Sequence, residues 1–358
     1  MVFLFEYILL LLQIFGYVIH FHMPTKYIYN LSLLLPGDII LTRDLNDPLS
    51  NRIMEATNSE FSHAMLYVGG SSFIDAENRV EAQNLQRCLF DSPFDTCVLR
   101  VKSEFISPQM IDRAIMYARS VVGNPYSLRD AIRLEKGHTE GATENSQICT
   151  RLVAKAYDYS GLKIVDNVEM CTPQQLLESK YVTVQRNFLK KATDDDLEFI
   201  TTHNVIDDMI TATEKLFDSL QKYNDGKICD MDALFKYVLE NPEDDEDIAR
   251  LLKESGYLNV YKKDEEFNKY NYEVNAFIKY YGENAYNGAI ESLQINQDGI
   301  GRYQQQYHVI KELYEKNGSK SLFLKLMTDL YEQIVFQYKK RIMICIEVII
   351  FFENSIDC

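Results

Sequence analysis

The chain has 358 residues, of which 46% are hydrophobic and 25% charged, with 15 glycines and 8 prolines. These proportions are typical of soluble folded proteins, so they exclude wholesale disorder, a collagen-like repeat and a polytopic membrane protein. The net charge is −16, and residues 191–300 carry 25 acidic and 11 basic side chains, a net charge of −14. Such an acidic segment repels a phosphate backbone, and we therefore expect no nucleic-acid partner.

Residues 1–30 begin with a strongly apolar stretch that runs from Met1 to Met23 and contains Glu6. Three interpretations of this stretch are open. The first is an export signal or anchor, which would associate the chain with a membrane through residues 1–22. The second is a buried or amphipathic helix. The third is a start-site artefact, with Met23 as the true first residue. The location of the protein stays open with them: membrane-associated or exported in the first case, otherwise cytoplasmic.

Residues 31–190 predict an α+β domain. Val, Ile, Phe and Tyr are frequent in short segments, which predicts strands at 38–42, 62–69, 73–77, 96–101 and 181–184. A Gly-Gly-Ser-Ser turn at 69–72 joins two of these strands as a hairpin. Ser107 and Pro108 indicate the start of a helix, which Gly123 ends. A second helix is expected over residues 148–160.

Residues 191–358 predict an acidic, mainly α-helical domain of unknown role. The acidic run at 241–247 suits a loop or the first turn of a helix, and residues 309–338 have the period of an amphipathic helix. The apolar stretch at 342–352 is too short to span a bilayer, so we expect a buried helix or strand there. This half could be a lid, a structural cap or a surface that recruits an unidentified protein partner.

Seven cysteines are present, and neither their odd number nor their spacing indicates a disulfide framework or a zinc site. Cys149 stands at the start of the helix expected over 148–160. Free backbone N–H groups and the positive end of the helix dipole favour a thiolate at such a position. A nucleophilic cysteine also needs a base, usually a histidine, within hydrogen-bonding distance.

His63 opens an otherwise apolar strand and is the candidate base. A third group must orient its imidazole. If the hairpin keeps odd-numbered residues of both strands on one face, Met65 lies near Asp75 and His63 lies near Glu77. A shift of the register by one residue would turn both carboxylates away.

These residues lie in a series of motifs that resembles a known family. The motifs are Gly37-Asp38-Ile39-Ile40, Ser62-His63-Ala64-Met65-Leu66-Tyr67-Val68-Gly69, Phe73-Ile74-Asp75-Ala76, Ile148-Cys149-Thr150-Arg151-Leu152-Val153 and Thr172-Pro173-Gln174-Gln175-Leu176. Their order resembles that of the circularly permuted NlpC-type papain-like hydrolases, the YiiX-like family, in which the histidine precedes the cysteine. The resemblance covers residues 33–185.

The resemblance implies a permuted papain-like fold, with a small antiparallel sheet packed on the helix that carries the cysteine. It implies Cys149 as the nucleophile, His63 as the general base and acid, and the acidic position of the third strand as the orienting group. That position is Asp75, where the family usually has the longer Glu, so Glu77 is the alternative. Tyr126 resembles a tyrosine that often precedes the cysteine helix, and either lines the substrate pocket or is buried for packing.

The function that follows is a thiol hydrolase, a peptidase or amidase, which cleaves an amide bond of a peptide or acyl-amide substrate through an acyl-enzyme. It would need no metal or organic cofactor. One alternative keeps the fold and transfers an acyl group from a lipid, as in the branch that resembles lecithin retinol acyltransferase. Another is a catalytically degenerate binding module.

Overall fold

The computed structural model describes residues 25–138, 141–143 and 146–356. The apolar stretch from Met1 to Met23, with its three interpretations, therefore lies outside the described residues. In the part that is described, no helix has both the length and the apolar character that crossing a bilayer requires.

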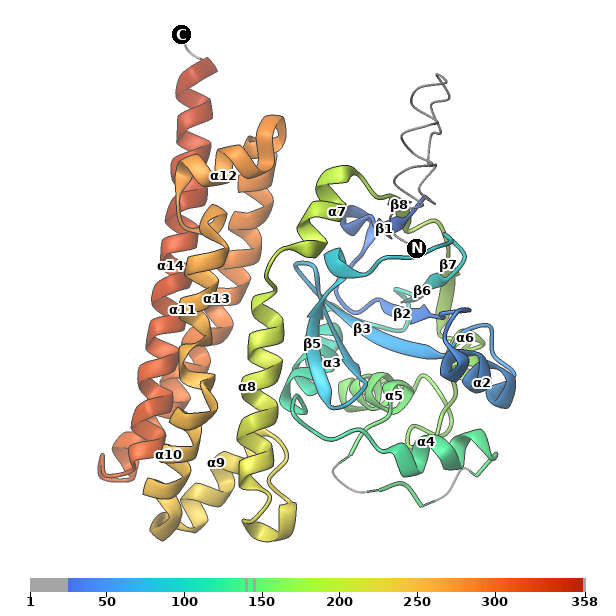
Figure 1. The fold of residues 1–358 in the computed structure, drawn as a ribbon, viewed down its shortest axis with the longest axis horizontal. Helices are drawn as coiled ribbons and strands as arrows, with labels where there is room; N and C mark the ends of the chain where they lie inside the picture. Colours follow the sequence, from blue (N-terminus) through green and yellow to red (C-terminus); the bar gives the residue numbers. More distant parts are fainter. Residues whose placement is uncertain (1–24, 139–140, 144–145, 357–358) are drawn as a thin grey trace, which may run out of the picture.

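A six-stranded antiparallel sheet forms the centre of the N-terminal half (Figure 1). The strand order is β5-β4-β3-β2-β6-β7. The strands are β2 (Ile39–Thr42), β3 (His63–Gly69), β4 (Ser72–Ala76), β5 (Val80–Asn84), β6 (Thr96–Val101) and β7 (Val182–Gln185). Each of these neighbouring pairs is antiparallel. A separate ribbon pairs β1 (Tyr27–Tyr29) with β8 (Leu189–Lys191).

The helices α3 (Pro108–Ser120) and α5 (Cys149–Ser160) pack on one face of the sheet. The main core lies between these two helices and the sheet, and it includes Leu66, Leu152 and Tyr157, each at most 1% exposed. Burial of this apolar area is the main driving force that fixes the start of α5 against the sheet. A smaller core on the opposite face joins strand residues such as Met65 and Phe73.

The expected fold class is confirmed: an antiparallel sheet packs on the helix that carries Cys149, and helices follow. The hairpin at 69–72 and the helices at 108–120 and 149–160 lie where the sequence predicts them. Several elements of this half had no counterpart in the sequence analysis. Among them are β5, α2 (Pro48–Thr57) and α4 (Leu128–Glu135), as well as the ribbon of β1 and β8.

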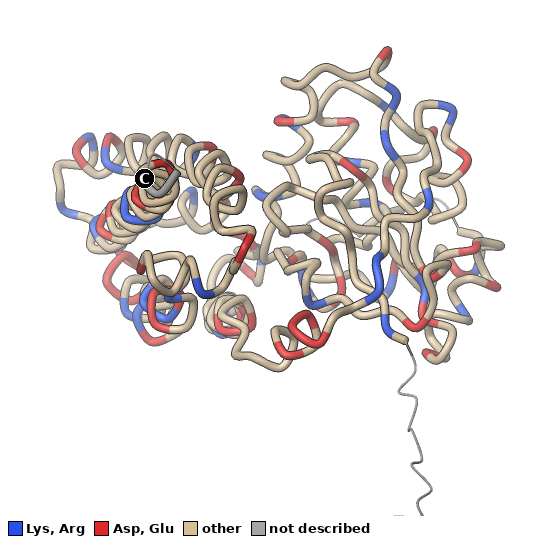
Figure 2. The backbone as a smooth tube through the Cα atoms, turned by 90° about the horizontal axis from the view of Figure 1, so that it is seen from above, with Lys and Arg blue, Asp and Glu red and all other residues tan. Residues whose placement is uncertain are grey.

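From α7 (Asp194–Thr201) onwards the chain is helical (Figure 1). The longer helices are α8 (Val205–Leu220), α9 (Met231–Glu240), α10 (Asp245–Ser255), α11 (Val260–Phe267), α12 (Val274–Tyr281), α13 (Ala285–Lys316) and α14 (Leu322–Ile356). Figure 2 shows that Asp and Glu are spread over several of these helices. The expectation of one helix over 309–338 was wrong, because Gly318 and Ser319 adopt positive φ angles of 66° and 55° and separate α13 from α14.

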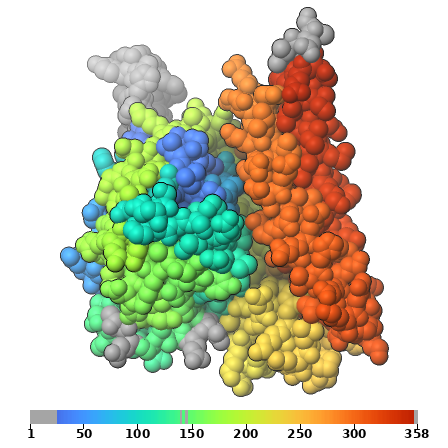
Figure 3. Space-filling view, turned by 180° about the vertical axis from the view of Figure 1, so that it is seen from behind, coloured from blue at the N-terminus to red at the C-terminus, as the bar shows by residue number. Residues whose placement is uncertain are grey.

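The two halves pack side by side, with α8 next to the edge strand β5 (Figures 1 and 3). Arg79 donates a hydrogen bond to the carbonyl oxygen of Gly123 and forms a 2.6 Å ion pair with Asp218 of α8. A Cβ atom at Gly123 would lie 2.7 Å from the ring of Phe217, and its φ of +101° also favours glycine. This close approach explains why the chain has no side chain at position 123.

Candidate active site

Cys149 is the first residue of α5 and is 9% exposed. The residue before it, Ile148, occupies the N-cap position and has no side chain that can cap the helix. Helices such as α3 and α4, by contrast, are capped by Ser107 and Ser127. The first backbone N–H groups of α5 therefore keep their hydrogen-bonding capacity for another acceptor. The N–H group of Cys149 belongs to this uncapped first turn.

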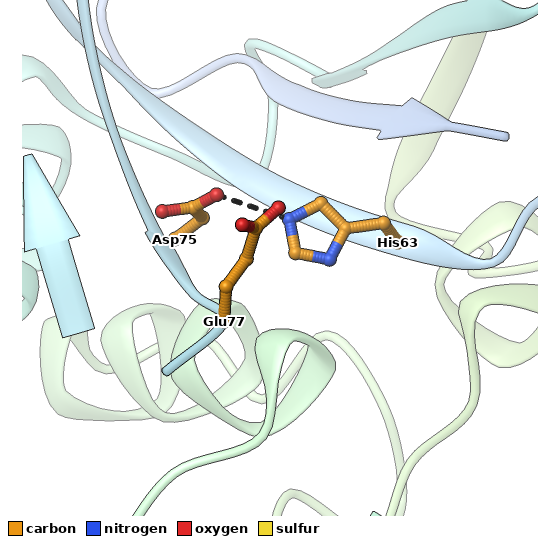
Figure 4. Close-up of side chains that lie close together, drawn as sticks. All are labelled: His63, Asp75 and Glu77. Atoms are coloured by element: carbon orange, nitrogen blue, oxygen red, sulfur yellow. Dashed lines mark hydrogen bonds and ion pairs between the residues drawn. The ribbon is translucent and has the colours of Figure 1, made fainter. Parts of the chain in front are cut away.

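His63 is the first residue of β3, and its Nε2 atom lies 3.2 Å from Oδ2 of Asp75 on β4 (Figure 4). The register of β3 and β4 pairs Leu66 with Ile74, so its continuation sets Asp75 opposite Met65. Asp75 therefore reaches His63 diagonally across the two strands, a distance that a carboxylate and an imidazole can bridge. The side chain of Asp75 is 3% exposed, whereas that of His63 is 20% exposed.

Glu77 follows the end of β4 and is exposed. One oxygen of its carboxylate lies within 4.8 Å of the ligand atoms of His63 and Asp75 (Figure 4). Both candidate carboxylates are thus close to the imidazole. The hydrogen bond to His63 is made by Asp75.

The charge state of His63 reflects its neighbours. Burial lowers the pKa of His63, but the charge of Cys149 and hydrogen bonds to Asp75 and Cys149 raise it, and so does the charge of Asp75. The net result is a pKa well above the ordinary value of 6.5. Because Asp75 occupies Nε2, Nδ1 is the ring nitrogen left for the thiol. Cys149, His63 and Asp75 thus lie next to one another in that order. A nucleophile, a base and an orienting acid require the same order.

A cleft of about 950 Å³ opens onto these residues. Its walls come from the loop before α2, from α2 itself, from residues 88–95 and from α4. Leu45, Leu49 and Phe94 stand on it with exposed fractions of 56%, 62% and 63%. The cleft is large enough for a substrate with groups on both sides of a scissile bond.

The cleft also contains a second thiol, Cys88. Burial, together with the charges of Asp75 and Glu77, raises the pKa of Cys88 to about 12. Burial likewise raises the pKa of Cys97 and of Cys171 to about 12. A thiol that stays protonated is a poor nucleophile, so none of these three is suited to catalysis at neutral pH.

Tyr126 lies in the wall of the cleft. Its backbone N–H donates to the carbonyl oxygen of Asn78, and it forms a parallel bridge with Gln147, two residues before Cys149. Burial and the nearby charge of Cys149 both raise the pKa of Tyr126. The phenol is therefore neutral and stands near Cys149.

His63, Asp75 and Glu77 also form a group whose ligand atoms are spaced closely enough to bind a metal ion. One imidazole nitrogen and two carboxylates are a common ligand set for divalent cations. A metal at this position would compete for the carboxylate that now orients His63. Metal binding and the use of His63 as a base would therefore exclude each other.

One known family matches part of this chain. Residues 34–200 match the family model described as "permuted papain-like amidase enzyme, YaeF/YiiX, C92 family". The match covers a little less than half of the chain. No curated protein matches the chain. A crystal structure described as metalloprotein yiiX from Escherichia coli O157:H7, DUF1105, matches with 17% sequence identity and a TM-score of 0.34, over 43% of this chain and 97% of that one.

The domain matched by the family model contains a buried ion pair that the sequence analysis missed. Arg151, two residues after Cys149, is completely buried and lies 2.8 Å from Asp130 of α4. Its guanidinium also donates to the carbonyl oxygens of Glu169 and Ser146, at 2.7 and 3.1 Å. These contacts hold the first turn of α5 against α4 and the segment that precedes Cys149. A buried cation without a partner is costly, so an arginine on an apolar helix was the signal that an acid must face it.

Asp130 is held by several donors. Burial raises its pKa, but hydrogen bonds from the backbone and side chain of Thr143, from Arg151 and from Ser127 lower it, with a net value of about 2. Asp130 therefore stays ionised opposite Arg151 throughout the physiological range. The ion pair therefore persists at physiological pH beside the helix that carries Cys149.

Glu81 is a second residue that the sequence analysis missed. It is the direct cross-strand partner of Asp75 on β5. Oε1 of Glu81 and Oδ1 of Asp75 are both buried without a hydrogen-bond partner among the described residues. Burial, followed by the charges of Asp75, Glu214 and Glu77, raises the pKa of Glu81 to about 7, against the opposing effect of Arg79. The carboxylate that orients His63 thus has an acid beside it that titrates near neutral pH.

Proposed function

We propose that the domain matched by the family model is a thiol hydrolase that cleaves an amide bond through an acyl-enzyme on Cys149. The observation that carries the proposal is the position of His63, which contacts the thiol of Cys149 on one side and the carboxylate of Asp75 on the other. The family match supports an amide as the bond that is cleaved. A peptide or an acyl-amide meets this description.

In the first half of the reaction, the thiolate of Cys149 attacks the carbonyl carbon and a C–S bond forms. The backbone N–H of Cys149 stabilises the oxyanion. The imidazolium of His63 then gives its proton to the amide nitrogen, the C–N bond breaks, and the amine leaves. The products of this half are the free amine and a thioester on Cys149.

In the second half, neutral His63 takes a proton from water, and the resulting hydroxide attacks the thioester carbon. The C–S bond breaks, the carboxylic acid leaves, and Cys149 returns to the thiolate. Asp75 keeps the imidazole oriented and stabilises its charged form in both halves. Each step uses side chains that lie in the cleft.

The test is turnover of a panel of peptide and acyl amides that release a fluorescent amine, with intact-protein mass spectrometry to detect the acyl-enzyme. We expect turnover and an acyl adduct in the wild type, and neither in Cys149→Ala. The matched control is Cys88→Ala, which removes the other thiol of the same cleft and should keep both. Turnover that persists in Cys149→Ala, or an adduct on Cys88, would contradict the proposal.

A second candidate is acyl transfer to an acceptor other than water. It is favoured by the exposed apolar side chains of Leu45, Leu49 and Phe94 on the cleft, which suit a long acyl chain. Incubation with a labelled phospholipid distinguishes the two candidates. A labelled acyl group on Cys149 that is passed to an added amine or alcohol faster than to water would favour the transferase. The absence of a labelled adduct would eliminate it.

A further inference from the structure

The C-terminal helix α14 presents an unpartnered apolar stripe on its outer side. We call the outer stripe the four residues Phe336, Met343, Ile346 and Ile350, which are 53%, 58%, 41% and 49% exposed. None of them belongs to the apolar clusters that the described residues form. The opposite side of α14 is covered: Cys345 and Val348 are at most 1% exposed and pack in a cluster with residues of α12 and α13.

The spacing of the outer stripe is that of a helix-pairing surface. Phe336, Met343 and Ile350 are seven residues apart, and Ile346 follows Met343 by three. These are three a positions and one d position of a coiled-coil heptad, and Lys339 occupies the other d position. The stripe from Phe336 to Ile350 is about 21 Å long, at 1.5 Å per helical residue. A second helix can therefore lie along it for about four turns.

Two residues of opposite charge lie along the outer stripe, one near each end. Lys339 lies on its N-terminal half and Glu347 on its C-terminal half, and both are exposed. Neither makes an ion pair with another residue in the described part of the chain. A parallel pair of α14 helices would set Lys339 against Lys339 and Glu347 against Glu347, which is unfavourable.

An antiparallel pair has the opposite consequence. A two-fold axis at Met343 brings a residue that lies n positions after Met343 in one copy next to the residue that lies n positions before Met343 in the other copy. It sets Phe336 against Ile350 of the second copy and Lys339 against Glu347 of the second copy. The same axis sets Ile346 against Lys340 of the second copy. The outer stripe is thus complementary to itself at Met343, in the pairing of Phe336 with Ile350, and in the charges of Lys339 and Glu347, as a two-fold interface between identical chains requires.

We propose that the outer stripe of α14 is a dimer interface, in which two copies of this chain pair their α14 helices antiparallel about Met343. In Figures 1 and 3, α14 forms an outer edge of the molecule, on the far side of the helical half from the sheet. Pairing there leaves the cleft at Cys149 open in both copies. The dimer therefore does not depend on the proposed function.

The test is sedimentation velocity of the full chain over about a hundredfold range of concentration, because a dimer of this kind dissociates on dilution. We expect a concentration-dependent dimer. Met343→Lys should abolish it, because two cations would meet at the axis. The matched control is Met116→Lys on α3, an exposed methionine (52%) outside the outer stripe, which should dimerise as the wild type does. Circular dichroism checks that both variants are folded.

A charge exchange tests the antiparallel register. Lys339→Glu and Glu347→Lys should each weaken the dimer, because each sets like charges against one another. The double variant should dimerise again, since its charges are only interchanged across the axis. A chain that is monomeric at every concentration, or a dimer that Met343→Lys leaves intact, would overturn the proposal. A monomer that binds neutral lipid vesicles through the stripe would also overturn it.

Discussion

Nε2 of His63 lies 3.2 Å from Oδ2 of Asp75, across two neighbouring strands of the sheet. The contact is diagonal, because the register continues to Met65 opposite Asp75. It leaves the other ring nitrogen for Cys149, and it uses a carboxylate that is almost completely buried. The first prediction concerns this contact.

Asp75→Asn should lower kcat for amide cleavage by about 10²- to 10⁴-fold, the range found when the acid of a catalytic triad loses its charge. The amide keeps the shape of the side chain but does not stabilise the imidazolium. Glu77→Gln is the matched control and should lower kcat much less, because Glu77 is exposed and the carboxylate that hydrogen-bonds to the ring is that of Asp75. Steady-state kinetics of the two variants decide which carboxylate orients His63. A larger loss in Glu77→Gln would reverse the assignment.

The second prediction concerns the pKa of His63. The charge of Cys149 and a hydrogen bond to it raise this pKa against the effect of burial. Cys149→Ala removes both contributions, so the pKa of His63 should fall in that variant. NMR titration of the imidazole resonances measures the change. An unaltered pKa would mean that the thiol and the ring do not interact.

The same pair contributes to folding. A histidine whose pKa is raised in the folded state stabilises the protein below its unfolded value of about 6.5. This contribution is lost as the pH rises through the folded value. The wild type should therefore lose more stability than Cys149→Ala between pH 6.5 and alkaline pH.

The third prediction concerns Glu81, whose pKa of about 7 is raised mainly by burial. Between pH 4.5 and 7, the side chain of Glu81 is mostly protonated in the folded protein but already ionised in the unfolded chain. Folding stability therefore falls as the pH rises from about 4.5 through 7. Glu81→Gln should flatten this part of the stability curve and make the protein more stable than the wild type above pH 7. Urea unfolding at pH 5 and pH 8 tests it, and equal pH dependence in both proteins would be the contrary result.

The fourth prediction concerns the buried pair of Arg151 and Asp130. Asp130→Ala leaves an uncompensated buried cation and should cost about 3–5 kcal/mol of unfolding free energy. The double variant Asp130→Leu with Arg151→Met should recover most of this loss, since neither charge remains. The pair's contribution should also disappear in acid, as the pH falls from about 4 through 2. Denaturant unfolding of the single and double variants provides the comparison, and a double variant no more stable than the single one would argue against an electrostatic cause.

Much of the fold could be predicted from local signals. The glycine pair marked the hairpin between β3 and β4. The register of the two strands stayed open, and the structure resolves it by pairing Leu66 with Ile74. Ser107 and Pro108 gave the start of α3. The start of α2 carried a similar signal, Asp47 followed by Pro48, which the sequence analysis did not use.

The rest depends on tertiary contacts. The strand β5 has a mixed pattern of polar and apolar residues, and its position follows from its pairing with β4 and its contact with α8. The choice between Asp75 and Glu77 depends on the diagonal reach across a twisted sheet, which residue spacing does not give. The partner of Arg151 lies on α4, 21 residues earlier, and only the packed structure brings the two together.

The most direct test of the central claim is the rate at which iodoacetamide alkylates Cys149 as a function of pH, in the wild type and in His63→Ala. If thiol and imidazole form an ion pair, the wild type should react rapidly at pH 6 to 7. In His63→Ala the reaction should become fast only as the pH approaches about 8.5, the ordinary value for a free thiol. Identical pH profiles in the two proteins would contradict the account.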